Sequence, residues 1–272
     1  MSAIPQQNKD NSVKKEGYQE GLHNLMSSFA EDSSTEQKGF NWEKHQSDYQ
    51  GPKPITEQVE FLAKEFKLSL NETNEFIEKV LPTLKLPKGA EGWFAIPSVD
   101  AIANRFFPGT TNLAERYCHA VHLVLEKISN YQKVYTCHSG PITPSNFRQH
   151  ERTLQSLSLI AEQQKSEILI VPAQFGIHHQ GRSVRQARDS FTDNEFGLGA
   201  FAVGCMLLNH PERSSLWMLI TDCAGDEFSP HNDENFLSTR LFGFSEGRIR
   251  FSSCYVDNAG SRRGSASGFI PQ

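Results

Sequence analysis

Two short polar segments follow the two strand-length apolar runs in the C-terminal half of this sequence. The first apolar run, residues 168–175, is followed by the segment GIHHQGRS. The second, residues 216–221, is followed by the segment DCAGDE. In sheets with helical crossovers, ligands bind where loops leave the carboxyl ends of the strands. If the two strands are parallel neighbours, we expect the histidines and the acids to share one rim.

The acids of the second segment suggest metal chemistry. Asp222, Asp226 and Glu227 supply carboxylate oxygens of the kind that hard divalent cations prefer. His178 or His179 would serve as a further ligand or as a general base. This arrangement predicts metal-assisted hydrolysis of a phosphoester or nucleotide, with His178, His179 and Asp226 as the catalytic residues. The alternative is a structural turn whose aspartates bond to neighbouring backbone groups.

The end of the first segment suggests an anion site. Gly181, Arg182, Ser183 and Arg185 surround the start of an expected helix, where free N–H groups and a partial positive charge attract anions. A phosphate-bearing small molecule would suit such a site. The segment matches neither GxGxxG nor GxxxxGK[ST], so it has only the general features of an anion site at a helix N-terminus. The alternative is a loop glycine, an N-cap serine and solvated arginines.

The composition restricts the classes of partner and the compartment. The net charge is −5, without the basic excess typical of general nucleic-acid or membrane-surface binders, so we expect neither activity. The five cysteines are odd in number and form no CxxC pair, which favours a reducing compartment. The N-terminus has no apolar signal segment, and no run reaches the roughly 18 apolar residues of a membrane helix. We therefore expect a soluble, cytoplasmic protein.

The distribution of apolar residues predicts three regions. Residues 1–54 are rich in polar residues and are expected to be a disordered tail. Residues 55–88 predict a helical hairpin, and residues 89–272 predict the main domain. That domain combines helices at 112–129 and 145–165, a buried glycine-studded helix within 196–208 and a C-terminal β-hairpin around residues 245–247. The order of elements predicts an α+β or α/β fold with a mixed sheet of about five or six strands.

Several segments also carry a resemblance. VPAQFG, GRSVRQAR, NEFGLGAFAVG, LLNHPER, DCAGDEF and GSASGFIPQ resemble a group of uncharacterised bacterial proteins over roughly residues 89–272. The resemblance implies a bacterial-type cytosolic protein whose C-terminus belongs to the fold. No activity is attached to that group, so no catalytic residue is transferred.

Three functional hypotheses follow from these observations. The first is a binding or accessory protein with an anion-capable cleft at strand ends. The second is the metal-assisted hydrolase, for which a divalent cation would be the cofactor. The third is a protein-interaction module that works through the N-terminal tail and helices.

Overall fold

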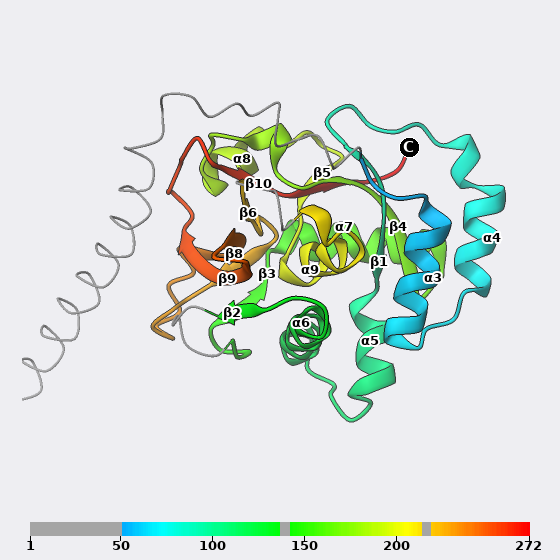
Figure 1. Cartoon of the computed structure of the whole chain (residues 1–272), viewed down its shortest axis with the longest axis horizontal. Coiled ribbons are helices and arrows are strands. Elements are labelled where there is room, and N and C mark those ends of the chain that lie inside the picture. Colours follow the sequence, from blue (N-terminus) through cyan, green and yellow to red (C-terminus); the bar gives the residue numbers. More distant parts are fainter. Residues whose placement is uncertain (1–50, 137–141, 214–218) are drawn as a thin grey trace, which may run out of the picture. The chain divides into compact units, whose positions relative to one another are not determined.

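The computed structural model describes residues 51–136, 142–213 and 219–272. These residues contain seven α-helices and two sheets, one of four and one of seven strands (Figure 1). The α+β fold class is therefore confirmed, although the strands divide between two sheets instead of forming one. The helices are α3 (Ile55–Phe66), α4 (Asn71–Lys79), α5 (Val99–Phe106), α6 (Leu113–Ser129), α7 (Glu151–Gln164), α8 (Val184–Ser190) and α9 (Ala200–Asn209), with 3-10 turns η1 (Leu81–Thr83) and η2 (Ile177–His179).

The smaller sheet is built around the first apolar run. Its strand order is β1-β4-β11-β5, and all its pairings are antiparallel. Its strands are β1 (Gly92–Pro97), β4 (Ile168–Gln174), β5 (Glu195–Gly197) and β11 (Ser267–Phe269). All seven residues of β4 are buried, as expected for a central strand, and helices α3, α4 and α7 contact it. The expected parallel neighbours are absent from β4, since β1 and β11 both run against it.

The larger sheet contains the C-terminal hairpin. The main path is β10-β6-β8-β7-β3, while β9 pairs with both β8 and β2. Its strands are β2 (Val134–Thr136), β3 (Phe147–Gln149), β6 (Ile220–Asp222), β7 (Asp226–Phe228), β8 (Ser238–Ser245), β9 (Arg248–Tyr255) and β10 (Arg263–Ser265). Glu246 and Gly247 form the turn between β8 and β9, both with positive φ, as the glycine in the turn had indicated. The second apolar run contributes only β6, and its residues 216–218 lie outside the described part of the chain.

The two sheets are joined by a tight passage of chain. β10 of the larger sheet leads through Ala266 into β11 of the smaller one. Beside this passage, the backbone of Gly264 lies against that of Gly176. A Cβ on Gly264 would be 2.0 Å from the carbonyl oxygen of Gly176, and Gly176 itself has a φ of 125°. Both positions therefore require glycine. β4 and β6 belong to different sheets, so their ends do not form one parallel rim.

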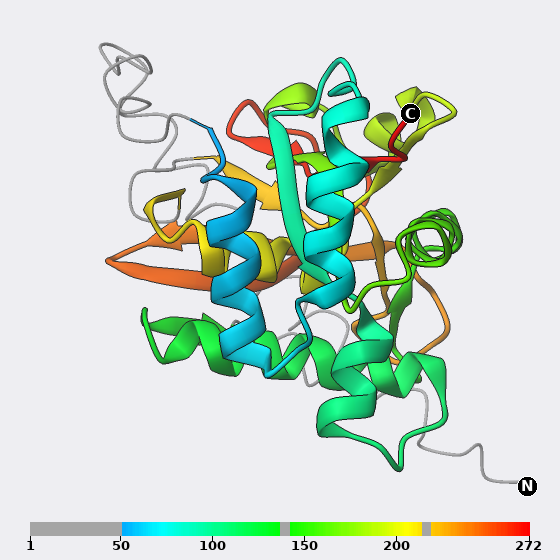
Figure 2. The ribbon, with the colours of Figure 1, turned by 90° about the vertical axis from the view of Figure 1, so that its right-hand side faces the viewer.

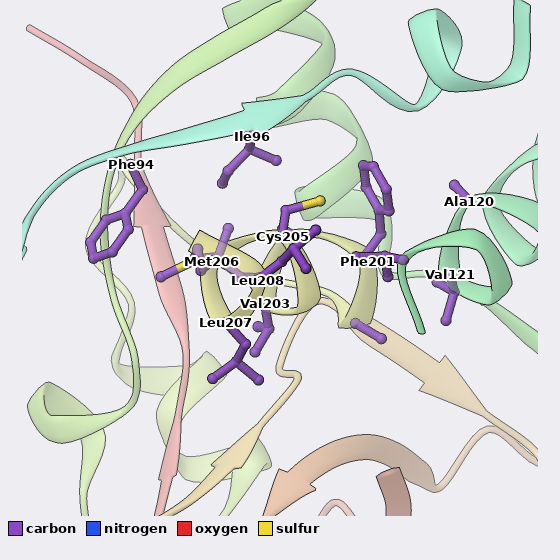
Figure 3. Close-up of a cluster of buried hydrophobic side chains, with 14 of the residues drawn as sticks. Phe94, Ile96, Ala120, Val121, Phe201, Val203, Cys205, Met206, Leu207 and Leu208 are labelled. Carbon is purple, nitrogen blue, oxygen red and sulfur yellow. The ribbon is translucent and has the colours of Figure 1, made fainter. Parts of the chain in front are cut away.

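Helix α9 occupies the centre of the core. The glycine-studded segment forms β5 first and then α9, all ten residues of which are buried. Figure 3 shows α9 with β1 residues Phe94 and Ile96 on one side and α6 residues on another. A Cβ on Gly204 would lie 2.8 Å from a methyl carbon of Val124, so this glycine permits the close approach of α6. The predicted buried helix is thus present, shorter than expected.

The predicted helical hairpin is also present. Figure 2 shows α3 and α4 side by side. Val59, Leu62 and Phe66 of α3 are fully buried and share one hydrophobic cluster with β4 and α9. The hairpin therefore contributes to the same core as the main domain. Most of the predicted N-terminal tail, residues 1–50, lies outside the described residues. None of the helices that the structure describes is long and apolar enough to cross a membrane.

Candidate functional site

A cavity of about 500 Å³ opens between α6 and α7. We call it the α6–α7 cavity. Its remaining walls come from the last residues of β1, the beginning of β4, the start of α5, strand β3 and the first turn of α9. These elements come from six separate stretches of sequence, which packing of the core brings together. The cavity lies outside both polar segments that the sequence had suggested.

Two exposed leucines, which we call the apolar lips, border the opening of the α6–α7 cavity. Leu113 on α6 is 62 % exposed and Leu154 on α7 is 41 % exposed, and both line the cavity. Leu157, Leu169 and Phe201 continue the apolar surface inward. Large exposed leucines on two facing helices are costly to keep in water, since apolar burial stabilises by about 25 cal/mol per Å². The lips are thus suited to contact an apolar body.

Two arginines also line the α6–α7 cavity, and their contacts differ. Arg116 is committed to the fold: its guanidinium donates to Asp100 Oδ1 at 2.7 Å, to Asn104 Oδ1 at 3.1 Å and to the Thr110 carbonyl at 2.8 Å. Arg148 of β3 is 52 % exposed at its side chain and donates from Nε to Glu227 Oε2 at 2.7 Å. Its guanidinium also lies over the ring of Phe236. Arg148 is therefore the cation that a ligand can reach.

A buried polar pair lies beside the first turn of α9. The Tyr117 hydroxyl donates to Asp226 Oδ1 at 2.5 Å, and the backbone N–H of Ala200 donates to Asp226 Oδ2 at 2.8 Å. Tyr117 lines the α6–α7 cavity, while Asp226 lies behind it, fully buried. A Cβ on Gly199 would be 2.2 Å from the Tyr117 hydroxyl and 2.4 Å from Asp226 Oδ1. Glycine is therefore needed where the chain passes over this pair.

Burial determines the protonation behaviour of the pair. Loss of water raises the pKa of Asp226 to about 7, although hydrogen bonds from Tyr117 and Ala200 and the charges of Arg240 and Arg188 all act to lower it. The pKa of Tyr117 lies well above its ordinary value, first because the phenol is buried and second because of the neighbouring charge of Asp226. Tyr117 thus remains a neutral donor, and Asp226 can change charge near neutral pH.

The three acids of the second polar segment have different partners. Asp222 accepts from Arg263 Nη2 at 2.6 Å, Asp226 from Tyr117 and Ala200, and Glu227 from Arg148. Burial raises the pKa of Asp222 above its ordinary value, although the charge and the hydrogen bond of Arg263 act in the opposite direction. Within the described residues, these three acids do not form a group whose ligand atoms converge. The structure therefore does not bring together the metal ligands suggested by sequence.

The groups suggested for anion binding are engaged within the chain. Gly181 donates its N–H to the Arg263 carbonyl, and the Ser183 hydroxyl accepts from the N–H of Gln186 in a capping box. Arg182 donates to Ser190 Oγ at 2.8 Å, and Arg185 forms an exposed ion pair with Asp257 at 2.6 Å. The short helix α8 thus has the N-cap serine expected from sequence, and the N–H groups of Arg185 and Gln186 in its first turn already have acceptors.

The two polar segments are nevertheless close, through α8. Val184 of α8 packs with Ala224 and Val256 in a small hydrophobic cluster. Arg188 donates from Nε to the Ala224 carbonyl at 2.9 Å and from Nη2 to the Asp226 carbonyl at 2.7 Å. The histidines, however, face another way: His179 Nε2 lies 2.7 Å from Oε1 of Glu195. His178 and His179 thus meet a carboxylate that the sequence had not singled out.

Tyr117, Arg148 and Glu195 are the residues that sequence reasoning did not place in a site. Tyr117 lies on the buried stripe of the helix that was expected at 112–129, and no site role was given to it. A phenol in such a stripe needs a hydrogen-bond partner, and that was the available signal. Glu195 stands directly before an apolar segment and is only 2 % exposed. Nothing in the neighbouring sequence indicates that this glutamate is buried.

Comparison with protein-family models, with curated proteins and with solved structures finds no match for this chain.

Proposed function

We propose that the chain is a binding protein for a small amphipathic molecule with an apolar body and one acidic group. The α6–α7 cavity, with its apolar lips and Arg148 at its edge, is the observation that carries this proposal. The volume of about 500 Å³ falls within the roughly 300–1,000 Å³ typical of small-molecule sites. We retain the binding-protein hypothesis, but we place the binding site in the α6–α7 cavity instead of at the strand-end loops.

In this proposal each part of the site has a role. The apolar body lies between Leu113 and Leu154 and extends toward Phe201. The acidic group pairs with Arg148, whose ion pair with Glu227 uses Nε and leaves its planar Nη edge for a second oxyanion. Arg116 acts indirectly, because its bonds to Asp100 and Thr110 hold α5 and the start of α6 in place.

The other two hypotheses have less support. Metal-assisted hydrolysis needs Asp222, Asp226 and Glu227 to share a cation, and their carboxylates bond to separate partners. The interaction module depends largely on the N-terminal tail, which is outside the described residues. A cytoplasmic location and a bacterial-type origin remain predictions from the sequence.

A dye with the same chemical character tests this proposal. Anilinonaphthalene sulfonate combines apolar rings with one anionic group, and its fluorescence rises on transfer from water to an apolar site. We expect saturable binding of one dye molecule by the folded protein. Ser158→Phe places a ring at an exposed position that lines the cavity and should weaken binding at least about tenfold.

Leu159→Phe is the matched control. Residue 159 is the next position on α7, is also exposed, and does not line the cavity. It should leave the dye affinity unchanged. Equal affinities for the Ser158→Phe and Leu159→Phe variants, both with cooperative thermal unfolding, would place the dye elsewhere and overturn the proposal.

A further inference from the structure

His178, His179 and Glu195 bring three potential metal-ligand side chains together. We call them the histidine cluster. One ligand atom from each side chain lies within 4.8 Å of the other two. No other three His, Cys, Asp or Glu side chains in the described residues meet this condition. The histidines come from η2 and the glutamate from the start of β5, so the cluster is formed by tertiary packing.

The buried side of the histidine cluster is oriented by a second layer of hydrogen bonds. Glu195 Oε1 lies 2.7 Å from His179 Nε2 and also accepts from the Ser267 hydroxyl at 2.6 Å. Gln174 Nε2 donates in turn to Ser267 Oγ at 2.9 Å. Gln174 Oε1 accepts from the backbone N–H of His178 at 3.3 Å. Such outer contacts hold first-layer ligands in position at metal sites.

The open side of the cluster is formed by His178. Its side chain is exposed, whereas His179 and Glu195 are only 1 % and 2 % exposed. The two imidazole rings have centroids 4.7 Å apart. Gly89, with a φ of 98°, packs against the His178 ring, since a Cβ there would be 3.0 Å from Nε2. An ion can therefore enter past His178, with further positions left for water.

We propose that the histidine cluster binds a late first-row divalent metal ion such as Zn²⁺, independently of the α6–α7 cavity. Two imidazoles and one carboxylate suit zinc, cobalt or nickel and are unsuited to Mg²⁺ or Ca²⁺, which prefer oxygen ligands alone. The carboxylate offsets one of the two charges of the ion. Glu195 and His179 need to move apart only slightly, because their facing atoms are already 2.7 Å apart.

Arg182 opposes this binding and so provides a distinctive test. Arg182 Nη1 lies 3.3 Å from His179 Nδ1, and a guanidinium can only donate, so Nδ1 accepts and the ring proton is on Nε2. A metal on Nε2 requires the tautomer with the proton on Nδ1. That proton would then face the guanidinium. We therefore infer that Arg182 moves aside when the ion binds and lowers the affinity of the site.

The experiment uses full-length protein, with Zn²⁺ titrated calorimetrically and Co²⁺ titrated by visible absorption. We expect one ion per chain and cobalt ligand-field bands typical of mixed nitrogen and oxygen ligation. His178→Ala should weaken binding at least about tenfold, since it removes one of three ligands. His231→Ala, which removes an exposed histidine outside the cluster, should change nothing.

Arg182→Gln should tighten binding several-fold, because a glutamine carbonyl can accept the proton on Nδ1. The absence of binding, or an affinity that is the same in wild type and His178→Ala, would overturn the proposal. A metal affinity that falls in Arg182→Gln, with folding intact by circular dichroism, would also contradict it. His178 and Arg182 both have exposed positions, so these variants are expected to fold.

Discussion

The hydroxyl of Tyr117 donates a 2.5 Å hydrogen bond to Oδ1 of Asp226, and both side chains are buried. The two residues are 109 positions apart in sequence. Their contact joins α6 to β7, and the second carboxylate oxygen joins β7 to the first turn of α9. The pair therefore fixes two walls of the α6–α7 cavity relative to each other.

Removal of the tyrosine hydroxyl should destabilise the protein. Tyr117→Phe leaves one oxygen of a buried carboxylate without its donor, which costs roughly 1–3 kcal/mol. Urea unfolding followed by circular dichroism measures the effect. Tyr131→Phe is the control, because its hydroxyl bonds to Glu65 at an exposed site and should contribute less than about 1 kcal/mol. Equal losses of unfolding free energy in the two variants would show that the buried hydrogen bond contributes no more to stability than the exposed one.

Asp226 should make stability depend on pH. Its folded-state pKa is raised to about 7, above the unfolded value of about 3.9. The resulting contribution to stability is complete below the unfolded pKa and is lost as the pH rises through 7. The stability of wild type relative to Asp226→Asn should therefore fall between pH 4.5 and 7.5, on the order of a few kcal/mol. Parallel pH profiles for the two proteins would refute this account.

Gly199 should not tolerate a side chain. In Gly199→Ala the new methyl group would overlap the Tyr117 hydroxyl and Asp226 Oδ1, so one of them must move. We expect a loss of roughly 1–3 kcal/mol in thermal or urea unfolding. Gly109→Ala has no heavy atom within 4 Å of the new Cβ and should stay within about 0.5 kcal/mol of wild type. A neutral Gly199→Ala would mean that the pair has room to relax.

The fold class and several elements could be predicted because they depend on local patterns. The strand at 168–174, the helix at 113–129 and the C-terminal hairpin all follow the expected periods of apolar residues. The division into two sheets could not be predicted, because an apolar run indicates burial and does not identify the neighbouring strand. The close contact of Gly264 with Gly176, which accompanies this division, depends on residues 88 positions apart.

The candidate sites were predictable only in part. His178 and His179 were recognised because two histidines followed a buried strand. Glu195 could not be assigned to them, since it lies beyond α8 and reaches them through the pairing of β5 with β11. The rim expected to join the histidines to Asp222, Asp226 and Glu227 had assumed that β4 and β6 were parallel neighbours, whereas they belong to different sheets. Short spacing placed these acids in one loop, and packing then directed them to three separate partners.

The most direct test of the α6–α7 cavity compares an acid with an alcohol of equal chain length. Calorimetric titration with decanoic acid and decanol separates the acidic group from the apolar body. In wild type we expect the acid to bind about five- to tenfold more tightly, or roughly 1–1.4 kcal/mol, as suits a partly exposed charge pair. Arg148→Gln should abolish this preference, whereas Arg185→Gln, which breaks a comparable exposed ion pair, should retain it. Equal affinity of wild type for acid and alcohol, or an acid preference that survives Arg148→Gln, would contradict the proposed function.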